Sequence, residues 1–205
     1  MKSRNIDIFI SGAGPAGLLA SISFASLGYS VICVDPHKPV THANDAGADL
    51  RTTAFLQPAK NFMQSLDLWA ELKSYAVPME IMRIIDAAGE NWPPKEKTTK
   101  DFLSSDISDL PFGWNIPNWL LRRAFTEKAN KYSNLELKFG LTTSSFIRRD
   151  DAAFVYLDDG SQIKAKLVIG ADGRNSFIRE RSQIKVSRTE FSQKALTFVV
   201  THEKP

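Results

Sequence analysis

Residues 9–36, FISGAGPAGLLASISFASLGYSVICVDP, place a glycine-rich turn between two apolar runs. The apolar pattern predicts a buried strand over residues 6–11, a helix over residues 15–27 and a second buried strand over residues 29–34. A helix that joins two parallel strands forms a right-handed βαβ unit. The stretch therefore indicates an α/β fold with a Rossmann-like, mostly parallel sheet.

The three glycines follow the GxGxxG spacing of a dinucleotide cradle. Gly12 lets the strand turn sharply, Gly14 lets the backbone approach a pyrophosphate, and Gly17 lets the helix pack closely on the strand. The helix N-terminus then faces the anion. Asp35 ends the second strand, where a carboxylate accepts hydrogen bonds from ribose hydroxyls and disfavours the 2′-phosphate of NADP. The alternative is a glycine-rich turn beside a surface aspartate. The predicted cradle consists of Gly12, Ala13, Gly14, Pro15, Ala16, Gly17 and Asp35.

The composition is that of a folded, cytoplasmic protein. Of the 205 residues, 43% are hydrophobic, and 26 basic against 23 acidic residues give a formal charge of +3 without a dense basic run, so no nucleic-acid partner is predicted. No apolar run reaches the ~18 to 20 residues that span a bilayer. Contact with the surface of the inner membrane stays open. The single Cys33 lies in an apolar run and is predicted to be a buried structural thiol.

Beyond this unit, apolar periodicity and breaker residues predict the remaining elements. Residues 54–72, with Pro58 in the first turn, and residues 118–133 are expected to be helical. The prolines within residues 91–117 predict an irregular segment. A short helix is expected to follow the strand in LVIGADG. Further strands are predicted over residues 79–86 and 195–201. A strand over residues 135–139 would join the parallel sheet, and strands over residues 154–157 and 163–167 would form a hairpin.

Two further stretches bear on whether the nucleotide is NAD or FAD. They are DLRTTAF at residues 49–55 and LVIGADGRNSFIR at residues 167–179. Together with GAGPAG they resemble the flavin-dependent aromatic hydroxylases of the para-hydroxybenzoate hydroxylase fold, and most closely the ubiquinone-biosynthesis hydroxylases. VDP at residues 34–36, IPNWLLRRAF at residues 116–125 and SQKALTFVV at residues 192–200 extend the resemblance over nearly the whole chain.

The resemblance implies FAD as the cofactor and NAD(P)H as its reductant. Asp172 and Gly173 match the family's Asp-Gly motif, which serves both nucleotides. Arg51 matches an arginine that approaches the flavin, and Asn118 matches a polar residue that reaches FAD from a helix start. The alternatives are a solvated Arg51, an ordinary N-cap at Asn118 and a simple turn at Asp172. For Asp172, the functional role is favoured because ligands of open α/β sheets gather at the carboxyl ends of strands.

The resemblance also implies a division into domains. Residues 1–75 and 115–182 would form the FAD/NAD(P)-binding domain, and residues 76–114 and 183–205 would form parts of a mixed or antiparallel β substrate domain. The family's later Gly-Asp-Ala motif is missing, because no glycine of this chain precedes an aspartate. We therefore expect the N-terminal part of a longer enzyme or a natural truncation, with an incomplete substrate domain and no activity of its own.

The implied reaction is hydroxylation of a phenolic ring, that of a polyprenylated ubiquinone precursor, with FAD, NAD(P)H and O₂. No catalytic acid or base can be named. His37, His42 and His202 lack metal-ligand spacing and are expected at the surface, so no metal is predicted. Four alternatives stay open: a hydroxylase of a small soluble aromatic, an isoprenoid reductase, a plain NAD-dependent oxidoreductase and a non-catalytic nucleotide-binding fragment. Association with other biosynthetic enzymes also stays open.

Overall fold

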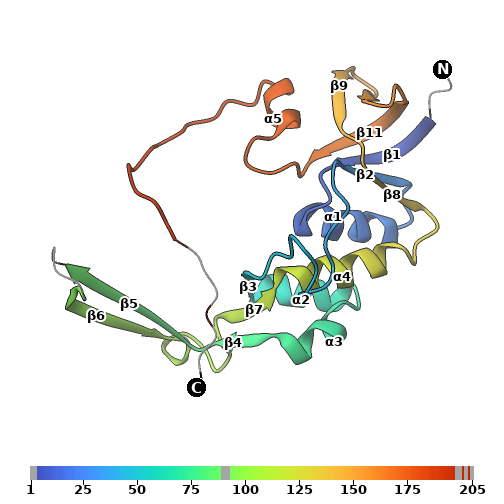
Figure 1. The fold of residues 1–205 in the computed structure, drawn as a ribbon. Helices are drawn as coiled ribbons and strands as arrows, with labels where there is room; N and C mark the ends of the chain where they lie inside the picture. Colours follow the sequence, from blue (N-terminus) through green and yellow to red (C-terminus); the bar gives the residue numbers. More distant parts are fainter. Residues whose placement is uncertain (1–3, 89–92, 197–199, 201–202, 204–205) are drawn as a thin grey trace. The chain divides into compact units, whose positions relative to one another are not determined.

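The computed structural model describes residues 4–88, 93–196, 200 and 203. The chain divides into two compact units (Figure 1). One consists of Met1–Arg51 with Asn118–Pro205, and the other of Thr52–Pro117. Within the described residues, no helix has both the length and the apolar character that a membrane crossing needs.

A six-stranded sheet forms the centre of the first unit, as far as the structure describes it, with the order β8-β2-β1-β11-β10-β9. The strands β8, β2, β1 and β11 run parallel, and β10 and β9 add antiparallel pairs at one edge. This confirms the predicted βαβ unit, the parallel strand over residues 135–139 and the hairpin. The strands are β1 (Arg4–Ser11), β2 (Val31–Asp35), β8 (Leu135–Phe139), β9 (Thr143–Arg148), β10 (Ala153–Leu157) and β11 (Gln162–Gly170).

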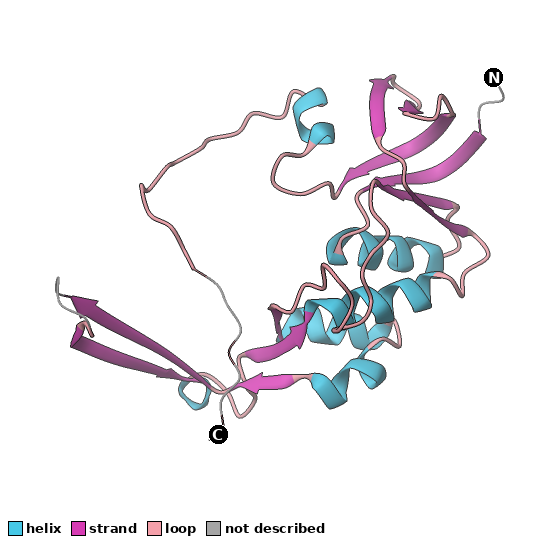
Figure 2. Cartoon of the chain, viewed as in Figure 1, coloured by secondary structure: helices cyan, strands magenta, loops and turns pink. Residues whose placement is uncertain are grey.

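Helices α1 (Pro15–Ser26) and α4 (Asn118–Ala129) pack against each other, and α1 also contacts β1, β2 and β8 (Figure 2). Pro15 starts α1 because proline has no amide hydrogen to lose in a first turn. Gly28, in the left-handed region at φ +87°, follows the end of this helix and donates its N–H to the Ala25 carbonyl. The predicted short helix after β11 is α5 (Phe177–Arg181).

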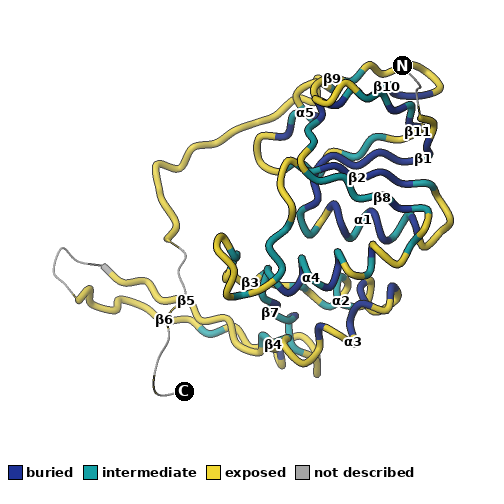
Figure 3. Tube along the Cα trace, turned by 45° about the vertical axis from the view of Figure 1, so that its right-hand side comes forward, coloured by how far each residue is buried: buried dark blue, intermediate teal, exposed yellow. Residues whose placement is uncertain are grey.

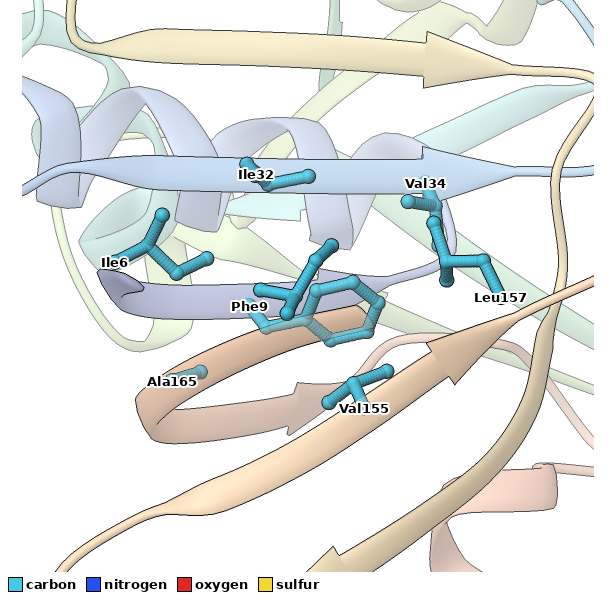
Figure 4. Packing of buried hydrophobic residues seen from close by; sticks show 8 residues of the cluster. Ile6, Phe9, Ile32, Val34, Val155, Leu157 and Ala165 are labelled. Carbon is cyan, nitrogen blue, oxygen red and sulfur yellow. The ribbon is translucent and has the colours of Figure 1, made fainter. Parts of the chain in front are cut away.

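The core of this unit lies where β1, β2, β10 and β11 meet. Phe9, Ile32 and Val155 are fully buried there beside other apolar side chains (Figure 4). Removing such a side chain from water is worth about 1.5–3 kcal/mol. Burial is nearly continuous along β2 and the second half of β1 (Figure 3), as expected for parallel strands covered on both faces. This core fixes the strand ends that carry the site.

Antiparallel pairing dominates the second unit. As described, it has a sheet in the order β3-β7-β4 and a separate two-stranded ribbon of β5 and β6. The residues of the ribbon whose burial is described are exposed, apart from the partly buried Asp101 (Figure 3). The elements are β3 (Thr52–Leu56), α2 (Gln57–Ser65), α3 (Trp69–Leu72), the 3₁₀ turn η1 (Lys73–Tyr75), β4 (Val77–Met79), β5 (Ile81–Ala88), β6 (Lys95–Leu103), the 3₁₀ turn η2 (Ser104–Asp106) and β7 (Gly113–Pro117).

Several sequence predictions for local structure are corrected. Residues 54–56 belong to β3, and the helix breaks before Trp69, where Asp67 adopts φ +55°. Pro58 does lie in the first turn of α2. Most of the segment 91–117, predicted to be irregular, forms strands where it is described, because β6 pairs with β5 and β7 pairs with β3 and β4, whereas residues 91 and 92 are not described. The charged strand β6 in this segment lacks apolar alternation, so its strand conformation becomes apparent only from its pairing with β5.

Two predictions fall partly outside the described residues. The strand predicted over residues 195–201 is absent at residues 195, 196 and 200, and residues 197–199 and 201 are not described. The stretch DAAGEN, residues 86–91, is also predicted to be a turn; its residues 86–88 belong to β5, and residues 89–91 are not described. Strand β9 had no prediction.

Candidate functional site

A cavity of about 440 Å³ opens at the carboxyl ends of β1, β2 and β11. Ser11 ends β1, Asp35 ends β2 and Ala171 follows β11, and all three line the cavity. These strands are neighbours and run parallel, so their carboxyl ends meet at one edge. Five of the residues predicted for cofactor binding share this cavity, namely Gly12, Gly14, Asp35, Asp172 and Gly173.

The turn after β1 has room only for glycine at position 12. Gly12 adopts φ +102°, and a Cβ there would lie 2.3 Å from the Ala171 carbonyl oxygen. Its N–H donates to the Val34 carbonyl at 2.7 Å, and the Ala171 N–H donates to the Ser11 carbonyl at 2.7 Å. The turn is therefore held between the ends of β2 and β11.

Gly14 and Gly17 serve different purposes at the start of α1. Gly14 is the N-cap of α1, no side chain caps this helix end, and no atom lies within 4 Å of the position that a Cβ would take. Pro15 and the exposed Ala16 follow in the first turn. A Cβ on Gly17 would instead lie 1.8 Å from the Gly12 carbonyl oxygen. The close approach predicted for Gly17 is thus to the turn after β1.

Asp35 connects the end of β2 to the turn. Its Oδ2 accepts the Ala13 N–H at 2.7 Å, and its Oδ1 accepts the His37 N–H at 2.8 Å. A carboxylate has about four lone-pair sites, so both oxygens keep acceptor capacity for a ligand hydroxyl. The carboxylate therefore orders the turn and still lines the cavity.

Asp172 and Gly173 form the turn between β11 and α5. The Asp172 carboxylate accepts hydrogen bonds from the Ser176 hydroxyl and, at 3.1 Å, from the Ile178 N–H. Gly173 adopts φ +83°, and a Cβ on Gly170 would lie 2.9 Å from Ile178 Cβ. Asp172 thus holds the start of α5 while it lines the cavity.

Arg51 and Asn118 form a second group, around Asp49. Among the described residues that line the cavity, neither is present. Arg51 donates from Nε and Nη2 to the two Asp49 carboxylate oxygens, each at 2.8 Å, and Asn118 Nδ2 donates to Asp49 Oδ2 at 2.9 Å. The Arg51 guanidinium, helped by Asn118, holds the pKa of the Asp49 carboxyl well below its usual range. Asn118 is also the first residue of α4.

The structure adds lining residues that the sequence analysis missed. Most come from segments that follow β2, β8 and β11. The signal for some of them was the parallel strand predicted at residues 135–139, because the loop after a parallel strand lies at the carboxyl edge of the sheet. Thr143 also donates its hydroxyl to Ser11 Oγ at 3.3 Å. The added residues are Ser11, Val34, Pro36, His37, Leu141, Thr142, Thr143, Ala171, Asn175 and Phe177.

The cysteine and histidine predictions are also resolved by the structure. Cys33 is fully buried, as predicted, and burial raises the pKa of its thiol to about 12. His37 and His42 are exposed, also as predicted, although His37 reaches the cavity. His202 lies outside the described residues.

A comparison with protein families identifies the cofactor. A family described as "FAD binding domain" matches residues 5–205. The chain belongs to this family of FAD-binding domains. FAD is thus its cofactor, and the cavity fits the diphosphate of FAD because the backbone at Gly14 is open and the helix start is uncapped by side chains.

The relatives of this FAD-binding chain include hydroxylases. Ubiquinone hydroxylase UbiL of Rhodospirillum rubrum is 26% identical over 198 residues, which cover 97% of this chain and 44% of that protein. The 3-demethoxyubiquinol 3-hydroxylase of Escherichia coli is 25% identical over 203 residues, which cover 99% and 50%. The chain thus spans about half the length of the curated relatives it matches.

Solved structures confirm the fold. The flavin-dependent monooxygenase PieE, in complex with FAD and substrate, superposes with a TM-score of 0.72 at 18% identity, over 91% of this chain and 33% of that one. The p-nitrophenol 4-monooxygenase PnpA from Pseudomonas putida superposes with a TM-score of 0.68 at 18% identity, over 87% and 44%. The α/β class predicted from the sequence, with additional antiparallel strands, is that of FAD-dependent monooxygenases.

Asp35→Ala is expected to weaken FAD binding by about 1–3 kcal/mol, the cost of losing a charged acceptor for ribose hydroxyls and of releasing the Ala13 N–H. A flavin fluorescence titration measures the change. Asp159→Ala, at an exposed turn aspartate between β10 and β11, is the control and should bind FAD like the parent. Equal affinities of the parent and the Asp35 variant would limit Asp35 to ordering the turn.

Proposed function

We propose that the protein is an FAD-dependent monooxygenase that uses NAD(P)H and O₂ to hydroxylate the phenolic ring of a polyprenylated ubiquinone precursor. The observation that carries this proposal is the similarity to ubiquinone-pathway hydroxylases, which extends over 97% and 99% of the chain. A similarity confined to the glycine-rich motif would support only nucleotide binding.

In this proposal the chain's own residues bind and orient FAD. The start of α1 and the turn Gly12–Gly17 receive the diphosphate, and Asp35 receives the ribose of the adenosine half. Asp172 and Gly173 close the same cavity, and Arg51 and Asn118 contact the cofactor from their own cluster. When bound, FAD supplies the redox chemistry that passes two electrons from NAD(P)H to O₂, placing one oxygen atom on the ring and the other in water.

A hydroxylase of small aromatic acids is a second candidate. The 3-(3-hydroxy-phenyl)propionate/3-hydroxycinnamic acid hydroxylase of Mycolicibacterium gilvum is 25% identical over 215 residues, which cover 98% of this chain and 34% of that protein. Its similarity thus extends as far along the chain as that of the ubiquinone hydroxylases. A polyprenylated substrate would favour contact with a membrane surface, whereas an aromatic acid would not.

We expect the complete protein encoded by the reading frame of these residues to form a hydroxylated prenylphenol. The assay supplies FAD, NADH or NADPH and ¹⁸O₂, with a prenylated phenol in one reaction and 3-(3-hydroxyphenyl)propionate in the other. Mass spectrometry detects labelled oxygen in the product. Label only in the propionate product would establish the second candidate. NAD(P)H consumption with no labelled product from either would overturn both candidates.

A further inference from the structure

The Asp49 carboxylate accepts hydrogen bonds from both Arg51 and Asn118, and the sequence analysis gave it no role. It lies in the loop that follows β2, two residues before Arg51 and 69 residues before Asn118. Four nitrogen donors hydrogen-bond this carboxyl group. They are the Arg51 Nε and Nη2, the Arg51 backbone N–H at 3.2 Å and the Asn118 side-chain amide.

The geometry fixes the Arg51 guanidinium and leaves some of its N–H donors available to a ligand. The bidentate contact engages Nε and Nη2, so Asp49 does not engage the Nη1 donors. The Arg51 side chain is 61% exposed, whereas Asp49 is 14% exposed. The Asn118 N–H also donates to the Arg51 carbonyl at 2.9 Å, which ties the start of α4 to the same residue. The carboxylate is covered, and the guanidinium faces solvent.

The positive charges around this carboxylate favour a ligand with negatively charged or hydrogen-bond-accepting oxygen atoms. Arg122 Nη2 lies 4.0 Å from Asp49 Oδ2, so two guanidinium groups flank one carboxylate. The first turn of α4, which starts at Asn118, contains no acidic residue. The positive end of the helix dipole adds to this surplus. Asp49 therefore neutralises only part of the positive charge of Arg51 and Arg122.

We propose that Asp49 is a positioning residue for the cofactor, which holds the Arg51 guanidinium and the Asn118 amide in the orientation that contacts oxygen atoms of FAD. This inference rests on the proposed contact of Arg51 and Asn118 with FAD. It assigns Asp49 no contact with FAD or substrate. A carboxylate is required because an asparagine would turn an amide N–H toward one of the guanidinium donors.

The chain offers a matched control for the loss of such a pair. On the β5–β6 ribbon, Arg83 donates from Nε and Nη2 to the two Asp101 oxygens, each at 2.8 Å. Arg83 is 59% exposed, much like Arg51. Asp101→Asn thus breaks an arginine–aspartate pair of the same geometry in the other unit, where no cofactor contact is proposed.

The experiment measures FAD dissociation constants by fluorescence titration for the parent and for Asp49→Asn, Arg51→Gln, their double variant and Asp101→Asn. We expect Asp49→Asn to weaken FAD binding about tenfold or more, because a charge-assisted hydrogen bond of the cofactor loses its alignment. Asp101→Asn should stay within about twofold of the parent. In the Arg51→Gln background, Asp49→Asn should add almost no further loss, because the group it positions is gone.

Each outcome decides the inference. A parent that binds FAD together with an Asp49→Asn variant of equal affinity would overturn it and leave the cofactor assignment intact. Fully additive losses in the double variant would also overturn it, because Asp49 would then act independently of Arg51. A parent that binds no FAD would overturn both this inference and the proposed function. Thermal unfolding of each variant confirms that the compared proteins are folded.

Discussion

Gly14→Val is expected to abolish FAD binding while leaving the fold intact. The new side chain would fill the open space beside the uncapped start of α1, where the diphosphate approaches the backbone. Losing two charge-assisted hydrogen bonds of about 1.5–3 kcal/mol each corresponds to at least about a hundredfold loss of affinity. The flavin absorbance of the purified protein and a fluorescence titration measure the effect.

The fold should tolerate this change because Gly14 has an ordinary backbone conformation. Its φ of −68° and ψ of 176° suit any residue, and no atom lies within 4 Å of the Cβ position. The stability change should stay below about 1 kcal/mol, the scale of an N-cap substitution. Gly14→Ala should show an intermediate loss of affinity. A folded Gly14→Val protein as yellow as its parent would contradict the assignment of the cradle.

Gly17→Ala is expected to destabilise the protein by about 3 kcal/mol or more, because overpacking a tight contact forces the backbone to move. The added Cβ would lie 1.8 Å from the Gly12 carbonyl oxygen and 3.2 Å from Ala171 Cβ. Neither neighbour can rotate away, since one is backbone and the other is a Cβ atom. Urea denaturation followed by circular dichroism measures the free energy of unfolding.

The same substitution three residues earlier is the control for Gly17→Ala. Gly14→Ala adds the same methyl group in open space, so its free energy of unfolding should stay near that of the parent. The pair separates the two uses of glycine in one motif, ligand access at position 14 and close packing at position 17. Equal stabilities of the two alanine variants would show that α1 can shift away from the turn, against the packing described above.

Much of the cradle was predictable because its causes are local in sequence. The spacing of Gly12, Gly14 and Gly17, with Pro15 at a helix start, constrains a single turn of backbone, and Asp35 follows from the end of the next strand. The hairpin around Asp159 was predictable for the same reason, since its strands are neighbours in the chain. Short-range patterns contain the information that these features need.

Features built by distant segments were not predictable in the same way. A strand that is a neighbour of its partner in the chain can also be missed, as β6 was, because it has no apolar alternation and is revealed only by its pairing with β5. The loop that brings Thr142 and Thr143 to the cavity reaches it because β8 joins the sheet beside β2. Domain boundaries and the roles of the predicted site residues remain predictions for the experiments above.

The βαβ unit and the glycine turn follow from the sequence alone, because each depends on residue types at fixed short spacings, and the family was indicated by the resemblance of several motifs. The packing of Gly12 against Ala171 and the connection of Arg51 to Asn118 through Asp49 became apparent only from the folded chain. Such contacts depend on how strands and helices from distant parts of the chain pack. No local spacing determines a distance between residues that only folding brings together.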